Sequence, residues 1–270
     1  MTGSAPEPAT LAGVILAAGA GTRLRPLTLL RPKALCPVGN VALVDLAIRN
    51  LAGHVSGVAV NVHHLRALLE EHLGCQVHLS IEEPAALGTA GAIGALRGWI
   101  DGRDVLIHNA DAYLPGGIDR LLAGWDGTRP RLLVRAEQED ADFGRLRYLG
   151  VSLLPWRHAR ECLPVVSGLY PSVWRAAEVN GEIEFVPYAG VAIDCGRPGD
   201  YLQANLAASG GASVIGAGAV VAGEVVRSVV WPGATVRAGE RLVEVIRAPV
   251  PGGPDLTVAA GPASLPQPAR

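Results

Sequence analysis

The chain contains very little lysine. Of the 23 Lys and Arg residues in its 270 residues, only Lys33 is a lysine. The arginines are scattered without a basic run and the net charge is −2, so a nucleic-acid polymer is not an expected partner. Lysine presents a compact point charge where arginine presents a planar fork. A single lysine in a chain that otherwise uses arginine indicates a site that needs a compact point charge. Phosphate is the anion that we expect to bind there.

Long apolar runs and paired cysteines are also lacking. No stretch reaches transmembrane length, and the N-terminus has no charged region followed by an apolar core, so we expect a cytoplasmic protein without a membrane partner. The four cysteines are far apart and form no Cys-x-x-Cys pair. This spacing predicts free thiols rather than zinc ligands or disulfides.

Apolar runs and helical spacings alternate through the first half of the chain. We expect strands at 11–17, 57–62, 77–81, 104–108 and 131–136, and helices at 41–51, 65–73, 89–99 and 118–125. Asn40 is the expected N-cap of the helix at 41–51. Such alternation predicts an α/β fold with a doubly wound, mostly parallel, Rossmann-like sheet.

The second half is less regular. Residues 146–154 and 165–170 suggest further strands, 172–179 a helix, and 198–208 a helix after the turn at 194–197. Residues 212–247 repeat aliphatic and small residues at roughly six-residue spacing, which favours a short hexapeptide-repeat β-helix. One or two irregular hairpins are the alternative. If copies of the chain pair, we expect the sheet edges of this segment to make the contact.

Both ends are expected to lie outside the folded core. We expect residues 1–10 to be flexible. Residues 249–270 are rich in Pro, Gly and Ala, and we expect disorder there apart from a few residues that dock.

Polar or Gly-rich sequence follows three of the expected strands. In open α/β sheets, ligands bind outside the carboxyl ends of the strands. That rule selects the loop at 17–25, the pair Glu82-Glu83, and the segment Asn109-Ala110-Asp111.

The loop at 17–25 has the chemistry of an anion site. Gly19 and Gly21 let the backbone approach a ligand, and successive amides in such a turn bind anions. Arg23 and Lys33 add charged donors. The loop is not a P-loop, because no Gly-Lys-Ser/Thr follows, and Leu24 replaces the third glycine of a dinucleotide fingerprint. Taken alone, it could equally be a tight strand-to-helix turn.

A longer pattern extends over residues 16–28, 31–34, 37–38, 82–91, 109–111 and 192–202. This pattern resembles the sugar-1-phosphate nucleotidyltransferase family, including its mannose-1-phosphate guanylyltransferase-like and short uridylyltransferase-like members. It spans about 11–208, which would be the nucleotidyltransferase domain, and the segment at 212–247 resembles the β-helical tail of some members.

The resemblance implies a site and a mechanism. Arg23 and Lys33 would be catalytic, neutralising the phosphates, and Asp111 and Asp194 would hold Mg²⁺. An NTP and a sugar-1-phosphate would react to give an NDP-sugar and pyrophosphate. The implied nucleotide-binding residues are Leu16, Ala17, Ala18, Gly19, Gly21, Thr22, Glu83 and Gly88. Taken without the resemblance, Asp111 and Asp194 could instead be helix caps.

The chain departs from this family at the sugar site. Many members have a Glu-Lys-Pro type segment between the two metal carboxylates, and this chain has no lysine there. Gly144 and Arg145 are the expected sugar-binding residues, and Arg145 or Arg157 could replace the missing ammonium. This departure leaves two alternatives open: cytidylyl transfer to a non-sugar phosphate such as phosphocholine, and a non-catalytic protein that binds NDP-sugars.

Two conspicuous groups are expected to be structural. Adjacent residues on an extended segment point to opposite faces, so His63 and His64 are expected to form hydrogen bonds separately rather than share a metal. Trp156, Trp174 and Trp231 are expected to pack in the interior.

Overall fold

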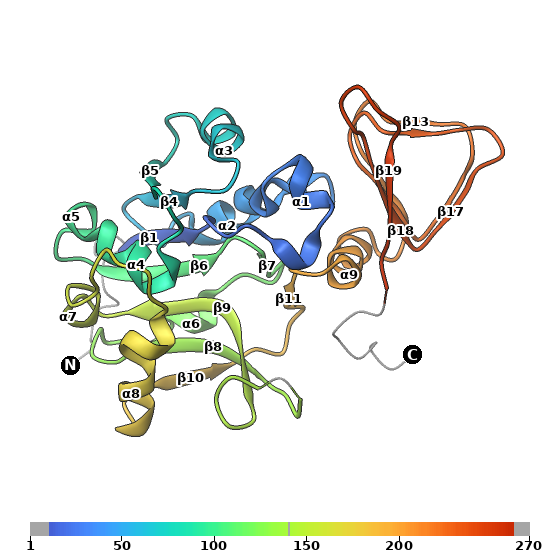
Figure 1. The fold of residues 1–270 in the computed structure, drawn as a ribbon. Helices are drawn as coiled ribbons and strands as arrows, with labels where there is room; N and C mark the ends of the chain where they lie inside the picture. The colour runs from blue at the N-terminus through green and yellow to red at the C-terminus, as the bar shows by residue number, and fades with distance from the viewer. Residues whose placement is uncertain (1–10, 140, 262–270) are drawn as a thin grey trace.

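A seven-stranded mixed sheet forms the centre of the molecule (Figure 1). The computed structural model describes residues 11–139 and 141–261, so the expectations for residues 1–10 and 262–270 lie outside the described residues. The strand order is β10-β8-β9-β6-β1-β4-β5. The strands are β1 (Leu11–Leu16), β4 (Val58–Val62), β5 (His78–Ile81), β6 (Asp104–Asn109), β8 (Arg131–Ala136), β9 (Leu146–Leu154) and β10 (Glu184–Pro187).

The sheet is mostly parallel, as the alternation predicts. β6, β1, β4 and β5 run parallel to one another, and β10 runs parallel to β8. β9 runs antiparallel to both β6 and β8. The α/β prediction with a mostly parallel sheet is therefore confirmed.

Alternating residues of β1 pack into two separate cores. Leu11 and Ile15 lie in the core on one face, and Ala12 and Val14 lie in the core on the other. This is the two-residue period of a strand that is buried on both sides. Helices cover both faces. On the first lie α2 (Leu43–Leu51), α3 (Arg66–Leu73) and α6 (Asp119–Leu122), and on the second lie α4 (Gly88–Ala95), α5 (Arg97–Ile100), α7 (Trp156–Ala159) and the turn that leads into α8 (Arg175–Val179).

Short elements complete the sheet domain. They are α1 (Leu27–Leu30), α9 (Pro198–Ala208), the strands β2 (Pro37–Val38), β3 (Val41–Ala42), β7 (Ala112–Tyr113) and β11 (Ile193–Asp194), the 3₁₀ turns Thr22–Leu24 and Lys33–Leu35, and the π-helical turn Tyr170–Trp174. Within the described residues, no helix is long and apolar enough to cross a membrane.

Three local expectations differ from the structure. Asn40 does not cap α2; it has φ 65° in the turn between β2 and β3, and Ala42 occupies the N-cap position. The helix expected at 89–99 is divided into α4 and α5. The strand expected at 165–170 is absent from this described segment, because the Ser167 carbonyl accepts the Ala90 amide of α4 at 3.0 Å instead of joining a sheet.

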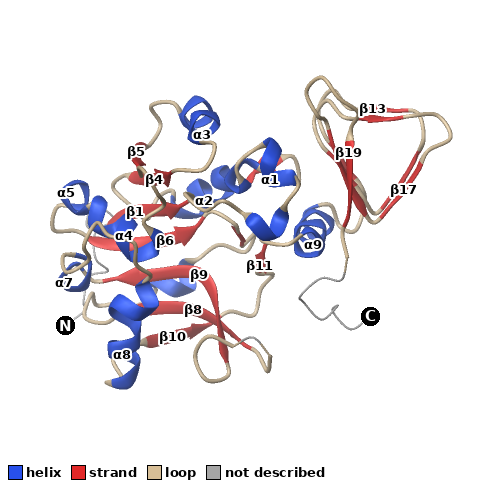
Figure 2. Cartoon of the chain, viewed as in Figure 1, coloured by secondary structure: helices blue, strands red, loops and turns tan. Residues whose placement is uncertain are grey.

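The C-terminal part forms a triangular coil (Figure 1) whose sides are short strands (Figure 2). Strands of successive turns pair in parallel, Val214 opposite Val229 and Val220 opposite Thr235. The strands are β12 (Val214–Ile215), β13 (Val220–Val221), β14 (Glu224–Val226), β15 (Val229–Val230), β16 (Thr235–Val236), β17 (Arg241–Val243) and β18 (Val245–Ala248). A further strand, β19 (Leu256–Ala259), pairs antiparallel with β18, so part of the segment expected to be mostly disordered is ordered.

The coil packs on the sheet domain through a tryptophan. Trp231 is fully buried and donates its indole N–H to the Tyr201 hydroxyl of α9 at 3.0 Å. Tyr201 donates in turn to the Pro37 carbonyl. The Arg31 guanidinium lies 4.3 Å from the centre of the Trp231 ring. The coil therefore contacts the segment that carries Lys33.

Candidate active site

The carboxyl ends of the central parallel strands meet at one edge of the sheet. In the sheet register Leu16 lies beside both Asn61 and Asn109. The Asn61 carboxamide accepts the Ala17 amide at 2.7 Å and donates to Glu82 at 2.8 Å. Glu82 also accepts the Leu87 amide at 2.7 Å. These bonds fix the loops that follow β1 and β5 against each other.

A cavity of about 240 Å³ opens between these loops, and we name it the glycine-side cavity. It is lined mainly by small residues and backbone. The lining residues are Leu16, Ala17, Ala18, Gly19, Lys33, Ala34, Asn61, Ala86, Gly88, Thr89, Asn109, Ala110 and Asp111. Five predicted nucleotide-binding residues, Leu16, Ala17, Ala18, Gly19 and Gly88, are therefore brought to one cavity.

The two glycines of the first loop have different surroundings. A Cβ atom added at Gly19 would meet no protein atom within 4 Å. Gly21 has φ 59°, and a Cβ there would come within 2.8 Å of the Thr28 methyl. Thr28 also donates its hydroxyl to the Gly21 carbonyl at 2.9 Å. Gly19 thus leaves space at the cavity, whereas Gly21 is required by the turn itself.

Gly88 joins the cavity to a second loop. It has φ 74°, and a Cβ there would come within 2.6 Å of the Ser167 carbonyl oxygen. The neighbouring Thr89 hydroxyl accepts the Leu169 amide at 2.7 Å. The absence of a side chain at Gly88 therefore lets the segment around 167–169 support this wall.

Two carboxylates meet where β6 ends. Asp111 follows β6, and β7 pairs with β11 so that Asp194 lies opposite Ala112. The Cys195 amide donates to the Asp111 carbonyl at 3.0 Å. This small two-stranded sheet explains how residues far apart in sequence reach the same place.

Each carboxylate has its own cation. The Lys33 ammonium donates to Asp111, and both side chains are mostly buried, with exposed fractions of 18% and 19%. Arg23 lies 3.4 Å from Asp194 in a more open pair. The two predicted phosphate-binding cations and the two predicted metal carboxylates thus form one cluster.

The cluster perturbs the pKa of each carboxylate in a different direction. Burial alone would raise the pKa of Asp111, but the charge and hydrogen bond of Lys33, together with smaller hydrogen-bond contributions, hold it below its ordinary value. Burial and then the negative charge of Asp111 raise the pKa of Asp194. Burial would lower the pKa of Lys33, but Asp111 holds it above its ordinary value. Asp194 is therefore the carboxylate whose charge the neighbouring cations compensate less completely.

The carboxylate pair fits a hard divalent cation. Such a cation prefers oxygen ligands and would relieve the repulsion between Asp111 and Asp194. Among the described residues, no cluster of three or more His, Cys, Asp or Glu side chains could hold a metal alone. Magnesium is commonly held by one or two carboxylates together with water and substrate phosphates.

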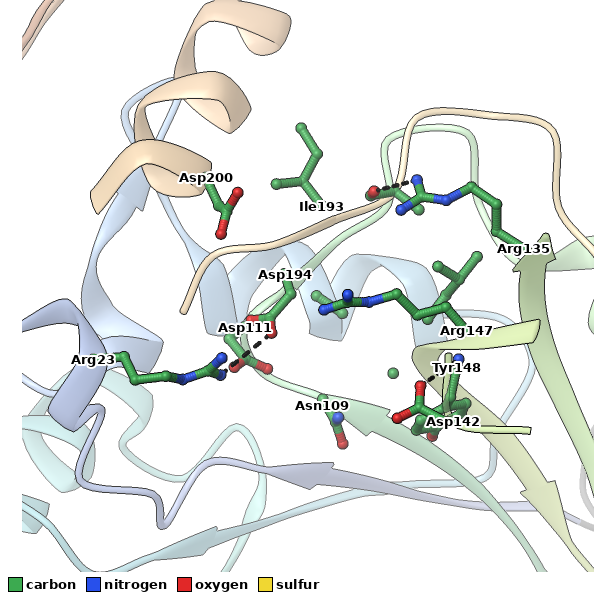
Figure 3. A pocket seen from close by; sticks show the side chains of 14 residues that line it. Arg23, Asn109, Asp111, Arg135, Asp142, Arg147, Tyr148, Ile193, Asp194 and Asp200 are labelled. Carbon is green, nitrogen blue, oxygen red and sulfur yellow. Dashed lines mark hydrogen bonds and ion pairs between the residues drawn. The ribbon is translucent and has the colours of Figure 1, made fainter. Parts of the chain in front are cut away.

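A second cavity, of about 270 Å³, lies on the other side of Asp111, and we name it the arginine-side cavity (Figure 3). Charged side chains dominate its wall. The lining residues are Arg23, Asn109, Asp111, Ala112, Arg135, Asp142, Arg147, Tyr148, Leu149, Gly150, Ala192, Ile193, Asp194 and Asp200. Asn109 and Asp111 line both cavities, so the two spaces meet at the carboxylate cluster.

Several predicted site residues are not brought to either cavity. Glu83 instead forms an ion pair with Arg66 at 3.1 Å. Its neighbour Glu82 accepts the Leu87 amide and so stabilises the loop after β5. Gly21 and Thr22 lie in the turn beside the glycine-side cavity but do not line it. Gly144 and Arg145 are both exposed and line neither cavity. Arg147, two residues beyond Arg145, lines the arginine-side cavity in their place.

Arg157 lies at the wrong end of the sheet. β9 runs antiparallel to β6, with Leu154 opposite Val105 and Val151 opposite His108. The residues after Leu154 therefore lie near the start of β6, and the Trp156 amide donates to Asp104 at 2.7 Å. The site is at the end of β6, so Arg157 cannot replace the missing lysine.

The sequence prediction also missed one residue of the glycine-side cavity and two residues of the arginine-side cavity. Asn61 had a usable signal, because it is a polar residue near the end of an apolar strand. Arg135 and Arg147 had none, because alternating arginines on strands ordinarily face solvent.

The expected structural residues behave as predicted. His63 contacts the Glu82 carbonyl at 2.9 Å, and His64 contacts the Thr28 carbonyl at 3.0 Å. All four cysteines are free.

The chain is similar to proteins of one family. The nucleotidyl transferase family profile matches residues 12–128. An N-acetylmuramate alpha-1-phosphate uridylyltransferase of Caulobacter vibrioides is 32% identical over 57% of this chain and 71% of its own length. A putative mannose-1-phosphate guanyltransferase of Sulfolobus acidocaldarius is 25% identical over 73% of this chain and 62% of its own length.

Solved structures support the same fold. A structure described as mannose-1-phosphate geranyltransferase from Thermus thermophilus aligns with a TM-score of 0.65 at 18% identity, covering 93% of this chain and 95% of that one. A putative glucose-1-phosphate thymidylyltransferase from Bacillus anthracis aligns with a TM-score of 0.59 at 16% identity, covering 73% of this chain and 95% of that one. These alignments show the fold, and the uridylyltransferase match covers more than two thirds of its relative. This chain therefore belongs to the nucleotidyl transferase family of enzymes.

Proposed function

We propose that the protein transfers a nucleotidyl group from an NTP to a sugar-1-phosphate, giving an NDP-sugar and pyrophosphate. One observation carries this proposal: two cavities meet at Asp111, with Lys33 on the glycine-side wall and Arg23 and Asp194 on the arginine-side wall. A transferase needs such an arrangement, because the group to be moved must reach both substrates at one point.

The glycine-side cavity would take the nucleotide. Its backbone amides around Ala18 and Gly19 would donate to phosphate oxygens, as successive amides do in anion-binding turns. Lys33 would exchange its contact with Asp111 for the triphosphate, and Arg23 would move similarly from Asp194. Both cations would then stabilise the charge that develops as pyrophosphate leaves.

Asp111 and Asp194 would hold the magnesium ion. When bound, Mg²⁺ would supply positive charge to the reacting phosphates. These carboxylates also fix the place at which the two substrates approach each other.

The arginine-side cavity would take the acceptor. A phosphate oxygen of the sugar-1-phosphate attacks the α-phosphorus in line, forming a new P–O bond as the bond to pyrophosphate breaks. No side chain has to remove a proton, because a phosphate monoester is already anionic near neutral pH. Positioning and charge neutralisation are then the contributions of this chain.

Pyrophosphate release tests the proposal. The wild type and Asp111→Asn are assayed with a panel of NTPs, each paired with sugar-1-phosphates and Mg²⁺. Asp119→Asn removes a carboxylate that is 86% exposed and remote from both cavities, so it serves as the matched control. We expect release only when both substrates are present, retained in Asp119→Asn and lost in Asp111→Asn.

The same panel separates the alternatives. Release with CTP and phosphocholine, but with no sugar-1-phosphate, would assign a non-sugar acceptor. Thermal stabilisation by NTPs or NDP-sugars without any release would indicate a binding protein, since a ligand at 100 times its Kd stabilises by about 2.7 kcal/mol.

A further inference from the structure

A fully buried histidine lies on β6, three residues before Asp111. His108 lines neither cavity, so the proposed reaction does not use it directly. Side chains alternate between the two faces of a strand, so His108 shares the face of Leu106, in the core that α2 covers. A buried imidazole has to find hydrogen-bond partners for its ring nitrogens within the protein. The partners of His108 therefore indicate its role.

His108 forms one hydrogen bond with each ring nitrogen. Nδ1 lies 2.8 Å from the Asn109 carbonyl oxygen, and Nε2 lies 3.2 Å from the carboxamide nitrogen of Asn50, near the end of α2. The same Asn50 nitrogen donates to the Leu114 carbonyl at 3.2 Å. The imidazole and the carboxamide thus form one unit, which we name the Asn50–His108 pair.

The partners of the pair determine where its protons lie. A carbonyl can only accept a hydrogen bond, so the Asn50 group that faces Leu114 must be its NH₂. This NH₂ also faces Nε2, which must therefore accept, and the imidazole proton must lie on Nδ1. Nδ1 then donates to the Asn109 carbonyl. Burial supports this neutral form, because it lowers the pKa of His108 to about 4.

The two carbonyls that accept these bonds lie on either side of Asp111. Asn109 precedes Asp111 by two residues, and Leu114 follows it by three. The Asn50–His108 pair therefore ties both ends of the segment 109–114 to α2, whose apolar face is packed in the core. Asp111 is held between two fixed points.

Two other bonds reach this segment from the site itself. The Leu16 carbonyl accepts the Ala110 amide at 3.0 Å, and the Cys195 amide donates to the Asp111 carbonyl at 3.0 Å. Leu16 lines the glycine-side cavity, and Cys195 follows the second carboxylate directly. The Asn50–His108 pair lies outside both cavities. No ligand in either cavity competes for its donors, so it can hold the segment in the same way before and after substrates bind.

We propose that the Asn50–His108 pair positions Asp111 for the divalent cation. This proposal rests on the proposed function, in which Asp111 holds Mg²⁺, and it assigns two positioning residues to that reaction. The side chain of aspartate is short, so its oxygens follow the backbone, and a displacement of about 0.5 Å is enough to disturb such a site. Removing groups that support metal ligands typically weakens metal binding or activity by about 10- to 100-fold.

Three substitutions test the pair. Asn50→Leu and His108→Leu replace each polar side chain by an apolar one and remove its hydrogen bonds. His108→Asn places an NH₂ group near the position of Nδ1, so it can keep the bond to the Asn109 carbonyl while losing the bond to Asn50. Because Asn50 is only half-buried, Asn50→Leu still tests the proposal if a change at the buried histidine prevents folding.

A buried serine in the coil provides the matched control. Ser228 is also fully buried and joins two backbone groups, the Val226 carbonyl at 2.8 Å and the Val245 amide at 3.1 Å. It lines neither cavity. Ser228→Ala therefore removes a comparable buried hydrogen-bonding group without touching the segment 109–114.

Mn²⁺ is the probe, because it accepts the same oxygen ligands as Mg²⁺ and its binding can be measured without turnover. Enhancement of water-proton relaxation gives its affinity, both for the metal alone and with each NTP of the panel, whose own Mn²⁺ complex is measured separately. Chemical denaturation gives the free energy of unfolding. Pyrophosphate release with Mg²⁺ gives kcat and the KM of the acceptor.

We expect Asn50→Leu and His108→Leu each to weaken Mn²⁺ binding by about 10-fold and to lower kcat. The KM of the acceptor should not change, because neither residue lines the arginine-side cavity. His108→Asn should recover part of the Mn²⁺ affinity. The double leucine variant should lose less than the two single losses combined, because contacting side chains act as one unit. Ser228→Ala should lower the free energy of unfolding and leave Mn²⁺ affinity unchanged.

Three results would overturn the proposal. The first is unchanged Mn²⁺ affinity in both leucine variants, with stability lost as in Ser228→Ala, which would leave the pair a purely structural role. The second is an equal loss in His108→Asn and His108→Leu, because the Nδ1 donor would then have no part. The third is a wild type that binds no Mn²⁺ with or without NTP. If no acceptor releases pyrophosphate, the transferase function fails separately, and the Mn²⁺ affinities still decide whether the pair positions Asp111.

Discussion

The two cavities that meet at Asp111 are built from opposite kinds of surface. The glycine-side wall consists mainly of backbone and small residues such as Ala17, Gly19 and Ala110. Half of the residues that line the arginine-side wall are charged, among them Arg147 and Asp142. Backbone amides bind any phosphate chain, whereas a few placed polar side chains select one ligand among similar ones. The glycine-side wall therefore suits a feature that many substrates share, such as a phosphate chain. The arginine-side wall suits a feature that distinguishes one substrate from another.

Lys33 is the sharpest exception to this division, because it is a long charged side chain in the glycine-side wall. We expect Lys33→Arg to lower kcat by about 10³-fold with the fold retained. The planar guanidinium of arginine cannot place a charged donor at the position of the buried lysine ammonium. Steady-state kinetics and circular dichroism measure the two outcomes. Arg160→Lys, the reverse exchange at an exposed site, should have no effect. Near-normal turnover in Lys33→Arg would show that this ammonium has no special role.

The two carboxylates between the walls should respond in opposite ways to neutralisation. Asp111→Asn leaves the mostly buried Lys33 ammonium unpaired, so we expect it to lower the free energy of unfolding by about 3 kcal/mol. Asp194→Asn removes a repelled charge and should slightly raise Tm when no metal is added. Chemical denaturation and thermal melting without Mg²⁺ provide the comparison. Equal losses in both variants would contradict the assigned ion pairs.

A single methyl group should separate binding from folding in the loop that follows β1. Gly21→Ala forces an L residue to φ 59° and a contact with Thr28, so we expect a loss of about 2 kcal/mol in stability. Gly19→Ala meets no protein atom and should leave Tm unchanged while weakening NTP binding by about 10-fold, the loss of about one phosphate contact. Melting curves with and without NTP report both effects. Unchanged NTP binding in Gly19→Ala would mean that the ligand does not approach this backbone.

Neighbouring arginines on one hairpin should give the smallest contrast. We expect Arg147→Gln to raise the KM for the acceptor phosphate by about 10-fold, because Arg147 lines the arginine-side cavity. Arg145→Gln should change it by less than about 2-fold, because Arg145 lies outside both cavities. Titration of the acceptor at saturating NTP gives the two values. A larger effect from Arg145 would restore the sequence prediction.

The difference between the glycine-side wall and the arginine-side wall also determines how much of each the sequence could predict. The glycine-side wall comes largely from short contiguous segments at strand ends, so strand periodicity and the motif at 16–28 locate it. The arginine-side wall depends on β9 running antiparallel and on the pairing of β7 with β11. No local pattern encodes those partners, so Arg147 could not be distinguished from Arg145 or Arg157. In the fold, the central parallel strands were predictable from alternation, whereas the irregular segment at 165–170 was not, because its backbone partners lie in α4.

The solitary lysine also makes the chain chemically addressable. Apart from the N-terminal amine, an acylating reagent can find only the Lys33 amine, which is mostly buried and held by Asp111. Its rate of acylation, followed by mass spectrometry of the intact chain, would report on the contact between Lys33 and Asp111. Weakening the ion pair in Asp111→Asn should accelerate labelling, whereas NTP in the glycine-side cavity should protect the amine. Occupancy of the site could thus be followed without a chromophore, a tag or turnover.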